Sequence, residues 1–219
     1  MTKSSELNVQ HNEFNSETGF MQVHFNDNDL QPIRDEIQKI LDGNVTRKDW
    51  RASLAGNIDK EYLLTDCFDY VEDLVGALIP SYDQHFNYIK GFDMLTGNVP
   101  IVLDNLWVNF QKKHEFNPVH HHTGILSFVI WLQVPYYMED EMSQGPGKAS
   151  NANHPGHFVF YYPSIGRPKA NIASTTLAVD RNWENILVLF PASLDHAVYP
   201  FYTSDQYRIS VSGNFKFKV

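Results

Sequence analysis

Cysteine is almost absent from this 219-residue chain, which contains a single one, Cys67. One cysteine cannot form an intramolecular disulfide, so the simpler expectation is a reducing compartment. Cys67 lies in an apolar pattern typical of a helix, and no histidine is next to it in the sequence. We therefore expect a small buried hydrophobic side chain at this position rather than a catalytic thiol.

Long apolar segments and an excess of positive charge are also missing. The first residues are polar and contain no apolar stretch of the kind found in secretion signals, and the apolar runs elsewhere are too short to cross a bilayer. Lysine and arginine number 17 against 26 aspartates and glutamates, for a formal net charge of -9. This balance gives no electrostatic reason to expect nucleic acid or a membrane surface as a partner. The sequence predicts a soluble, cytoplasmic protein.

The length of 219 residues suits a single domain with one well-filled core. Residues 1–18 are polar and show no period, so we expect a flexible leader. Residues 19–98 are expected to form a helical support region, in which residues 20–25 alternate as a first strand does and residues 44–57 form a loop. The remaining residues, 99–219, are expected to form the β core.

Two stretches of the support region have the period of amphipathic helices. The first is expected to begin at Asp29 as N-cap, to contain Pro32 in its first turn and to stop at Gly43. The second covers residues 68–89, where apolar side chains recur three and four positions apart and Pro80 interrupts the pattern. Both helices are expected to pack on a sheet through their apolar faces.

Short β segments dominate the second half of the chain. They are rich in β-branched and aromatic residues and are separated by Gly, Pro and Asn. The expected strands are residues 106–112, 116–122, 126–134, 156–162, 174–179, 186–190, 196–201 and 207–217. Eight strands in succession predict a jelly roll or barrel, so the fold class is mainly β with flanking α-helices.

One segment between these strands, residues 136–156, is too long and too polar for a tight turn. Loops of this length in a compact domain are usually lids, binding loops or disordered insertions. The acidic cluster of Glu139, Asp140 and Glu141 within it is expected to be a solvated face rather than a set of ligands.

Three consecutive histidines, His120, His121 and His122, suggest a metal site. On a strand, residues i and i+2 point to the same side, so His120 and His122 would share a face while His121 faces away. Two buried imidazoles without a metal or an acid as partner would waste hydrogen-bonding groups. His196, which follows the apolar strand at residues 186–190, is a distant third candidate. Imidazoles alone do not choose among Fe, Zn, Ni and Cu.

A basic residue, Arg208, follows His196 on the last predicted strand and favours iron with an acid cosubstrate. A facial set of three protein ligands leaves three positions open, where the keto-acid end of 2-oxoglutarate and O₂ can bind. The far carboxylate of that cosubstrate needs a fixed cation, and a guanidinium binds a carboxylate through two parallel hydrogen bonds. Ser210 shares the face of Arg208 and can add a hydrogen bond. We expect His196 and Arg208 on adjacent antiparallel strands.

Three segments together resemble a known family: NPVHHHTGILSFVIWLQVP (117–135), LFPASLDHAVYPF (189–201) and RISVSGNF (208–215). They are similar to small 2-oxoglutarate- and Fe(II)-dependent oxygenases related to prolyl hydroxylases, many of them encoded by bacteriophages. The likeness covers roughly residues 100–217, with a weaker echo in AGNIDKEYLL (55–64). It implies a double-stranded β-helix with iron at one mouth.

The resemblance implies a role for each candidate residue. His120, His122 and His196 would hold Fe(II), Arg208 and Ser210 would anchor 2-oxoglutarate, and Asn109 and Ser127, on neighbouring strands, would add polar contacts. The implied reaction is hydroxylation of a small-molecule or peptide substrate, coupled to oxidative decarboxylation of 2-oxoglutarate to succinate. O₂ is then a cosubstrate and ascorbate a candidate reductant. The implied location is bacterial cytoplasm, including that of a phage-infected cell.

One position departs from the wider superfamily, in which most members have a carboxylate two positions after the first histidine, where this chain has His122. Asp195 is a poor substitute, because it should face away from His196 on a strand, and it is expected to orient a histidine instead. Two other functions remain open. A cupin also has H-x-H and a later P-x-x-x-x-H, although its usual glutamate is missing here. A non-catalytic jelly-roll protein for structure or assembly would need no metal.

Overall fold

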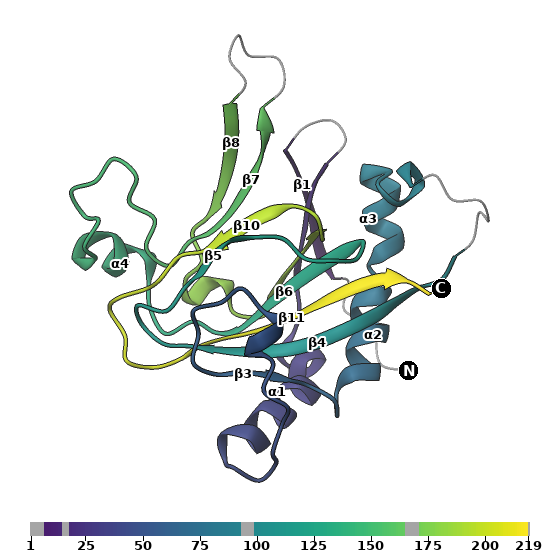
Figure 1. Cartoon of the computed structure of the whole chain (residues 1–219), viewed down its shortest axis with the longest axis horizontal. Helices are drawn as coiled ribbons and strands as arrows, with labels where there is room; N and C mark the ends of the chain where they lie inside the picture. The colour runs from purple at the N-terminus through teal and green to yellow at the C-terminus, as the bar shows by residue number, and fades with distance from the viewer. Residues whose placement is uncertain (1–6, 15–17, 93–98, 165–170, 219) are drawn as a thin grey trace.

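Two antiparallel β-sheets pack face to face in the structure, a computed structural model that describes residues 7–14, 18–92, 99–164 and 171–218 (Figure 1). The large sheet has the strand order β1 (Asn8–Glu13), β2 (Gly19–His24), β9 (Ile186–Pro191), β6 (Leu126–Gln133), β11 (Arg208–Phe217), β4 (Ile101–Gln111) and β3 (Glu61–Leu63). The small sheet has the order β5 (Asn117–His120), β10 (Asp195–Val198), β7 (Phe158–Ser164) and β8 (Asn171–Leu177). The prediction of a jelly-roll core is confirmed.

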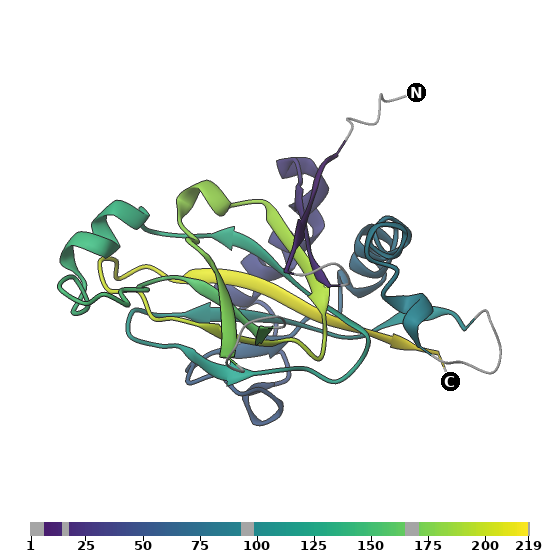
Figure 2. The ribbon, with the colours of Figure 1, turned by 90° about the horizontal axis from the view of Figure 1, so that it is seen from above.

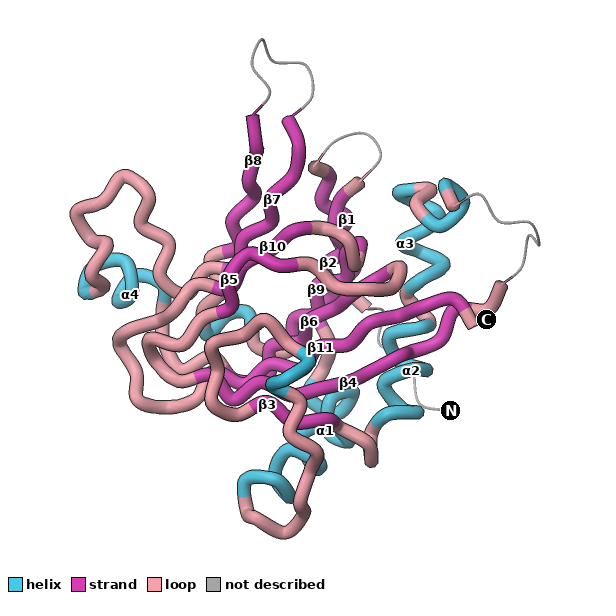
Figure 3. Tube along the Cα trace, viewed as in Figure 1, coloured by secondary structure: helices cyan, strands magenta, loops and turns pink. Residues whose placement is uncertain are grey.

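Helices surround the strands (Figure 3). They are α1 (Asp27–Leu41), α2 (Phe68–Gly76), α3 (Ile79–Phe86), α4 (Met138–Gln144) and the short 3-10 turns η1 (Arg51–Ser53), η2 (Ile89–Gly91) and η3 (Arg181–Trp183). In Figures 1 and 2, α4 lies at the end of the molecule opposite to α2 and α3. No helix among the described residues is long and apolar enough to span a membrane. The cytoplasmic location stays a prediction.

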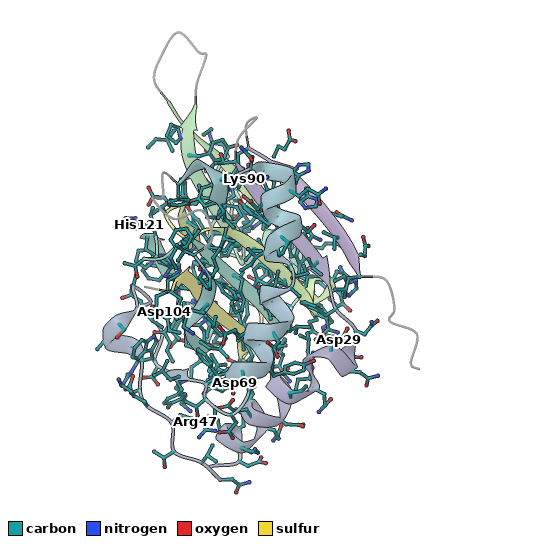
Figure 4. The ribbon with its side chains drawn as sticks, turned by 90° about the vertical axis from the view of Figure 1, so that its right-hand side faces the viewer. Asp29, Arg47, Asp69, Lys90, Asp104 and His121 are labelled. Carbon is teal, nitrogen blue, oxygen red and sulfur yellow. The ribbon has the colours of Figure 1, made fainter. Side chains whose placement is uncertain are left out.

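The alternation of side chains along β6 explains the layers. Phe128 and Ile130 belong to the apolar cluster shared with the N-terminal helices, whereas Val129 and Trp131 belong to the cluster between the two sheets. A strand buried on both faces is therefore sandwiched between helices and a second sheet. The predicted packing of the N-terminal helices on the sheet is confirmed, and Figure 4 shows α2 and α3 in front of the strands.

The predicted start of the first helix was three residues late. The N-cap is Asn26, whose backbone N–H donates to Asp29 Oδ2 at 3.0 Å, so Asp29 is the third residue of a capping box rather than the cap itself. Pro32 consequently lies inside α1 rather than in its first turn. The predicted stop was correct, since α1 ends at Leu41 and Gly43 has φ +71°.

The leader predicted for residues 1–18 is wrong for β1, which pairs with β2 in register from Asn8 opposite His24 to Glu13 opposite Gly19. This edge strand has mostly polar, partly exposed side chains, so its backbone hydrogen bonds hold it in place without an apolar period. Residues 1–6 and 15–17 of the expected leader lie outside the described residues.

Other boundaries also moved. The strand β4 begins at Ile101, before the expected residue 106, and β3 was not expected at all. The second helical stretch divides into α2 and α3, with Pro80 in the first turn of α3, where a missing N–H costs nothing.

The prediction of a solvated acidic face in residues 136–156 is wrong for Glu141. This segment contains α4, in which Glu139 and Asp140 are exposed but Glu141 is fully buried. Its carboxylate accepts hydrogen bonds from the backbone N–H groups of Tyr202 and Thr203, both at 2.8 Å, and from the Thr203 hydroxyl. Glu141 thus fastens α4 to the segment that connects β10 and β11.

We expect the substitution Glu141→Ala to lower the free energy of unfolding by about 2–4 kcal/mol, because it leaves the partly buried backbone N–H groups of Tyr202 and Thr203 without an acceptor. Chemical denaturation measures the difference. Glu139→Ala is the matched control on the same helix and should change the free energy by less than about 0.5 kcal/mol. Equal losses for the two variants would contradict the structural role of Glu141.

Candidate active site

Three imidazoles converge between the two sheets. His120 is the last residue of β5 and stands opposite His196 on β10, and His122 lies two positions beyond the end of β5. The ring centroids are 4.3 Å apart for His120 and His196, 5.0 Å for His120 and His122, and 5.1 Å for His122 and His196. One nitrogen of each ring lies within 4.8 Å of the others, so the three could hold one metal ion.

Backbone carbonyls orient two of these rings. Nδ1 of His120 donates to the carbonyl of Pro118 at 2.7 Å, and Nδ1 of His196 donates to the carbonyl of Leu194 at 2.9 Å. Because a carbonyl oxygen can only accept, Nδ1 carries the proton in both rings and Nε2 keeps a free lone pair. That lone pair is what a metal requires.

His122 reaches the cluster by a route that the strand pattern did not predict. The strand β5 ends at His120, so the expected strand 116–122 is too long, and the backbone N–H of His122 donates to the carbonyl of Ala192 at 2.8 Å. Two residues on, Gly124 has φ +112°, and a Cβ there would lie 2.6 Å from the carbonyl oxygen of Phe215. Glycine is therefore required in the turn that follows His122.

Burial keeps all three imidazoles neutral. Loss of solvent lowers the pKa of His122 to about 3 and also lowers the pKa of His120 and of His196. Repulsion from His120 lowers the pKa of His122 and of His196 further, and repulsion from His121 does the same for His120. Neutral imidazoles with free lone pairs are ligands for a divalent transition metal. The donor set thus fits iron.

The neighbouring pair of His121 and Asp195 lies outside the cluster. Nδ1 of His121 is 3.0 Å from Asp195 Oδ1, and both side chains are more than half exposed. Figure 4 shows His121 at the margin of the molecule. Asp195 does contact a histidine, but that histidine is not one of the three that converge, and no carboxylate joins them among the described residues.

Arg208 was expected on a strand adjacent to that of His196, and this prediction is wrong. His196 belongs to the small sheet and Arg208 begins β11 in the large sheet, yet both line the same cavity between the sheets. The segment between β10 and β11 crosses from one sheet to the other, which brings the two residues face to face.

The Arg208 guanidinium is buried, and each of its five N–H groups has an acceptor. Nε and Nη2 both donate to Gln111 Oε1, at 3.1 and 2.7 Å. Nη1 donates to the Tyr136 hydroxyl at 2.6 Å and to the Gly156 carbonyl at 2.8 Å. The second proton of Nη2 is donated to the Tyr199 carbonyl at 3.1 Å. All these acceptors are neutral. The buried charge therefore has no anion among the acceptors that the described residues offer it.

Sequence reasoning missed Gln111 and Tyr136 in this arrangement. Gln111 could have been found, because it alternates with Asn109 on the same face of β4 and stands opposite Arg208. Tyr136 follows β6 and carries no periodic signal, so only the folded chain brings its hydroxyl to the guanidinium.

The other predicted polar residues also line the cavity. Asn109 Nδ2 donates to Ser210 Oγ at 3.2 Å, and Ser127 Oγ donates to Asn214 Oδ1 at 2.8 Å. Asn109 and Ser127 were expected on neighbouring strands, but β11 lies between β4, which carries Asn109, and β6, which carries Ser127. The seven predicted residues thus converge on one cavity, His120, His122, His196, Arg208, Ser210, Asn109 and Ser127.

A group of buried acceptors at the side of this cavity has no donor in the part of the chain that the structure describes. It consists of both carboxylate oxygens of Glu61 and the amide oxygens of Asn109 and Asn117. Glu61 is fully buried and stands opposite Asn109 in the pairing of β3 with β4, so their side chains share a face. Sequence reasoning missed Glu61, although it lies in residues 55–64, which also showed a weak resemblance to the family.

Burial raises the pKa of Glu61 to about 7, and the negative charge of Glu115 adds to this effect. Arg51 acts in the opposite direction and Asp49 in the same direction, both more weakly. When the pKa of a carboxyl is higher in the folded state than in the unfolded state, the free energy of unfolding falls as the pH rises from the unfolded pKa to the folded pKa. Glu61 should therefore destabilise the ligand-free protein at alkaline pH.

We expect Glu61→Gln to stabilise the ligand-free protein at pH 8 by up to about 3 kcal/mol, because the amide cannot ionise. The free energy of unfolding of the original protein should fall between pH 4.5 and about 7, and this fall should be smaller in the variant. Urea denaturation at several pH values measures both. Glu139→Gln, an exposed acid, is the control, and an unchanged pH profile in Glu61→Gln would contradict the raised pKa.

A comparison with protein families shows where the chain belongs. The profile of the family described as "Putative 2OG-Fe(II) oxygenase" matches residues 105–214, which contain all three histidines and Arg208. The chain belongs to this family. No curated protein sequence matches the oxygenase.

Solved structures of similar fold support this assignment. The prolyl-4-hydroxylase of Pseudomonas putida has a TM-score of 0.54 at 14% identity, over 92% of this chain and 94% of the other. HygX of Streptomyces hygroscopicus, in a crystal structure with nickel, 2-oxoglutarate and hygromycin B bound, has a TM-score of 0.55 at 11% identity, over 92% and 84%. AviO1 of Streptomyces viridochromogenes Tue57 has a TM-score of 0.52 at 11% identity, over 92% and 90%. At these identities the likeness concerns the fold.

The predicted family, whose description names Fe(II) and 2-oxoglutarate, is therefore confirmed, and the three histidines could hold one metal ion. The family assignment makes the chain an enzyme, and its fold is similar to that of a prolyl-4-hydroxylase. Neither the cupin alternative nor the non-catalytic alternative gains support from the comparisons. The use of ascorbate stays a prediction.

Proposed function

We propose that the oxygenase hydroxylates a small-molecule or peptide substrate while 2-oxoglutarate is converted to succinate and CO₂. One oxygen atom of O₂ enters succinate and the other enters the new hydroxyl group of the substrate. The observation that carries this proposal is the opposition, across one cavity, of three neutral imidazoles and a buried guanidinium without an anion. A metal ion satisfies the first group and a dicarboxylic acid satisfies the second.

His120, His122 and His196 are the proposed Fe(II) ligands, through the ring nitrogens that face one another. When bound, Fe(II) supplies the activation of O₂ that an organic side chain cannot provide. Three protein ligands leave positions open for the keto acid and for O₂. The extra imidazole at His122, in place of a carboxylate, leaves the site one negative charge short of the usual set.

Arg208 is the proposed anchor for the far carboxylate of 2-oxoglutarate. Its N–H groups now contact neutral oxygens, and a carboxylate is a stronger acceptor, so it can replace some of these contacts. Ser210 can assist. Its Oγ accepts from Asn109, which leaves the serine proton free to donate to the carboxylate.

Aromatic side chains shield the histidines from water. The ring of Phe158 stacks on His196 with centroids 5.3 Å apart, Phe190 lies 5.0 Å from the same ring, and Trp107 lies 5.6 Å from His122. These contacts limit the rotation of the imidazoles. They also keep bulk water from competing for a reactive site.

An anaerobic titration tests this function. Purified protein with Fe(II) and 2-oxoglutarate should develop the weak visible absorption band of an iron-bound keto acid, and on admission of O₂ it should release succinate slowly even without a substrate. The matched control is His121→Ala, which removes a histidine outside the cluster and should leave both signals unchanged. A protein that binds neither Fe(II) nor 2-oxoglutarate would favour the non-catalytic alternative.

A further inference from the structure

The orphaned acceptors beside the cavity lie close together. A Cβ on Gly56 would be 2.9 Å from both Glu61 Oε1 and Asn117 Oδ1, so these two oxygens lie against the same glycine. Asn109 and Asn117 line the cavity that holds the three histidines, as do Leu54 and Ala55 of the neighbouring loop. Glu61 does not itself line this cavity but lies directly behind it, opposite Asn109 and against Gly56, on the side closed by β3.

When Glu61 is ionised, the oxygens of this group accept hydrogen bonds and none of them carries a proton to donate. Four buried oxygens of three residues are unpaired among the described residues, and one pair of them belongs to an acid. Buried acceptors of this kind normally have partners, and leaving them unpaired costs free energy. Glu61 therefore gains no stabilising hydrogen bond from its side chain among the described residues.

We propose that Glu61, together with the amide oxygens of Asn109 and Asn117, binds a primary ammonium group of the substrate. This inference rests on the proposed function and names the class of its substrate, an amine-bearing compound. An ammonium group has three donors and no acceptor, which matches a set made only of acceptors. It also brings the positive charge that a buried carboxylate requires.

Binding of a probe amine tests the inference separately from turnover. The protein loaded with Ni(II) and 2-oxoglutarate is titrated at pH 8 with propylammonium chloride, and binding is followed by saturation-transfer NMR. We expect saturable binding of propylammonium and none of 1-propanol, which has the same chain without the charge. In Glu61→Gln the dissociation constant should rise by roughly tenfold or more.

Glu115→Gln is the matched control, because it removes a nearby acid whose two oxygens already accept from the backbone N–H groups of Asp59 and Lys112. Its affinity for propylammonium should equal that of the original protein. A cooperative thermal unfolding transition is expected for Glu61→Gln and checks that this variant is folded.

The inference would be overturned if propylammonium did not bind saturably, or if Glu61→Gln bound it as tightly as the original protein. It would also be overturned if sodium or potassium chloride at low concentration displaced propylammonium, since this would indicate a site for a simple cation. Failure of the proposed function has a different signature. In that case propylammonium binds but no succinate is released with Fe(II), 2-oxoglutarate and O₂.

Discussion

Replacing His196 with alanine is expected to weaken Fe(II) binding by more than roughly a hundredfold and to abolish succinate release. Mutation of residues that merely support a metal ligand already costs about 10- to 100-fold in affinity, and loss of a proposed ligand should cost more. His196 is the most deeply buried of the three imidazoles and contacts both of the others. Without it, His120 and His122 supply only two of three proposed ligands.

Anaerobic titration with Fe(II), or with Co(II) as a spectroscopic substitute, measures this affinity. The ligand-free variant should stay folded, because alanine removes a polar ring that is unfavourable to bury without a metal. His85→Ala is a suitable control, since His85 lies at a distant surface where it stacks on His11. Unchanged Fe(II) affinity in His196→Ala would disprove the proposed ligand set.

Replacing Arg208 with alanine is expected to raise the KM for 2-oxoglutarate by about a hundredfold or more. Truncation of one partner of a buried charge pair typically costs about 2–5 kcal/mol, and 3 kcal/mol corresponds to roughly a hundredfold. Fe(II) binding should persist, because the guanidinium is not among the proposed ligands. The split between the two affinities separates an anchor for the cosubstrate from a residue that only supports the fold.

The stability of the Arg208 variants must be measured alongside, because the guanidinium also holds Gln111, Tyr136 and two backbone carbonyls. Arg208→Lys keeps the charge and should recover part of the affinity for 2-oxoglutarate. Lys216→Ala removes a positive charge from an exposed position on the same strand and serves as the control. If Arg208→Ala is folded and its KM for 2-oxoglutarate is unchanged, Arg208 is not the anchor.

The convergence of the histidines could be predicted although one step of the reasoning was wrong. His120 and His122 were expected to share the face of a strand, but β5 ends at His120 and His122 reaches the cluster from the following turn. The prediction still places the rings together, because a turn held by Ala192 and Gly124 leaves the second ring near the first.

The acidic residues could not be sorted from the sequence. Glu139, Asp140 and Glu141 are adjacent and chemically alike, yet Glu141 is buried because it accepts from the backbone N–H groups of Tyr202 and Thr203. Glu61 is likewise buried by a short strand that gave no periodic signal. Each depends on a partner far away in the chain, which local patterns do not reveal.

The sequence by itself determined the jelly-roll class, the helices that cover one sheet and seven of the residues that line the cavity. The fold class and the helices follow from local signals, since the period of a strand or helix states which side chains share a face. The family, by contrast, was recognised from the resemblance of three sequence motifs. Only the tertiary structure decided that His196 and Arg208 belong to opposite sheets, that Tyr136 contacts the guanidinium, and that Glu61 lies unpaired beside the cavity. The pairing of strands that are far apart in the sequence depends on how the connecting loops cross between the sheets. The apolar period of a strand does not indicate which strand pairs with it.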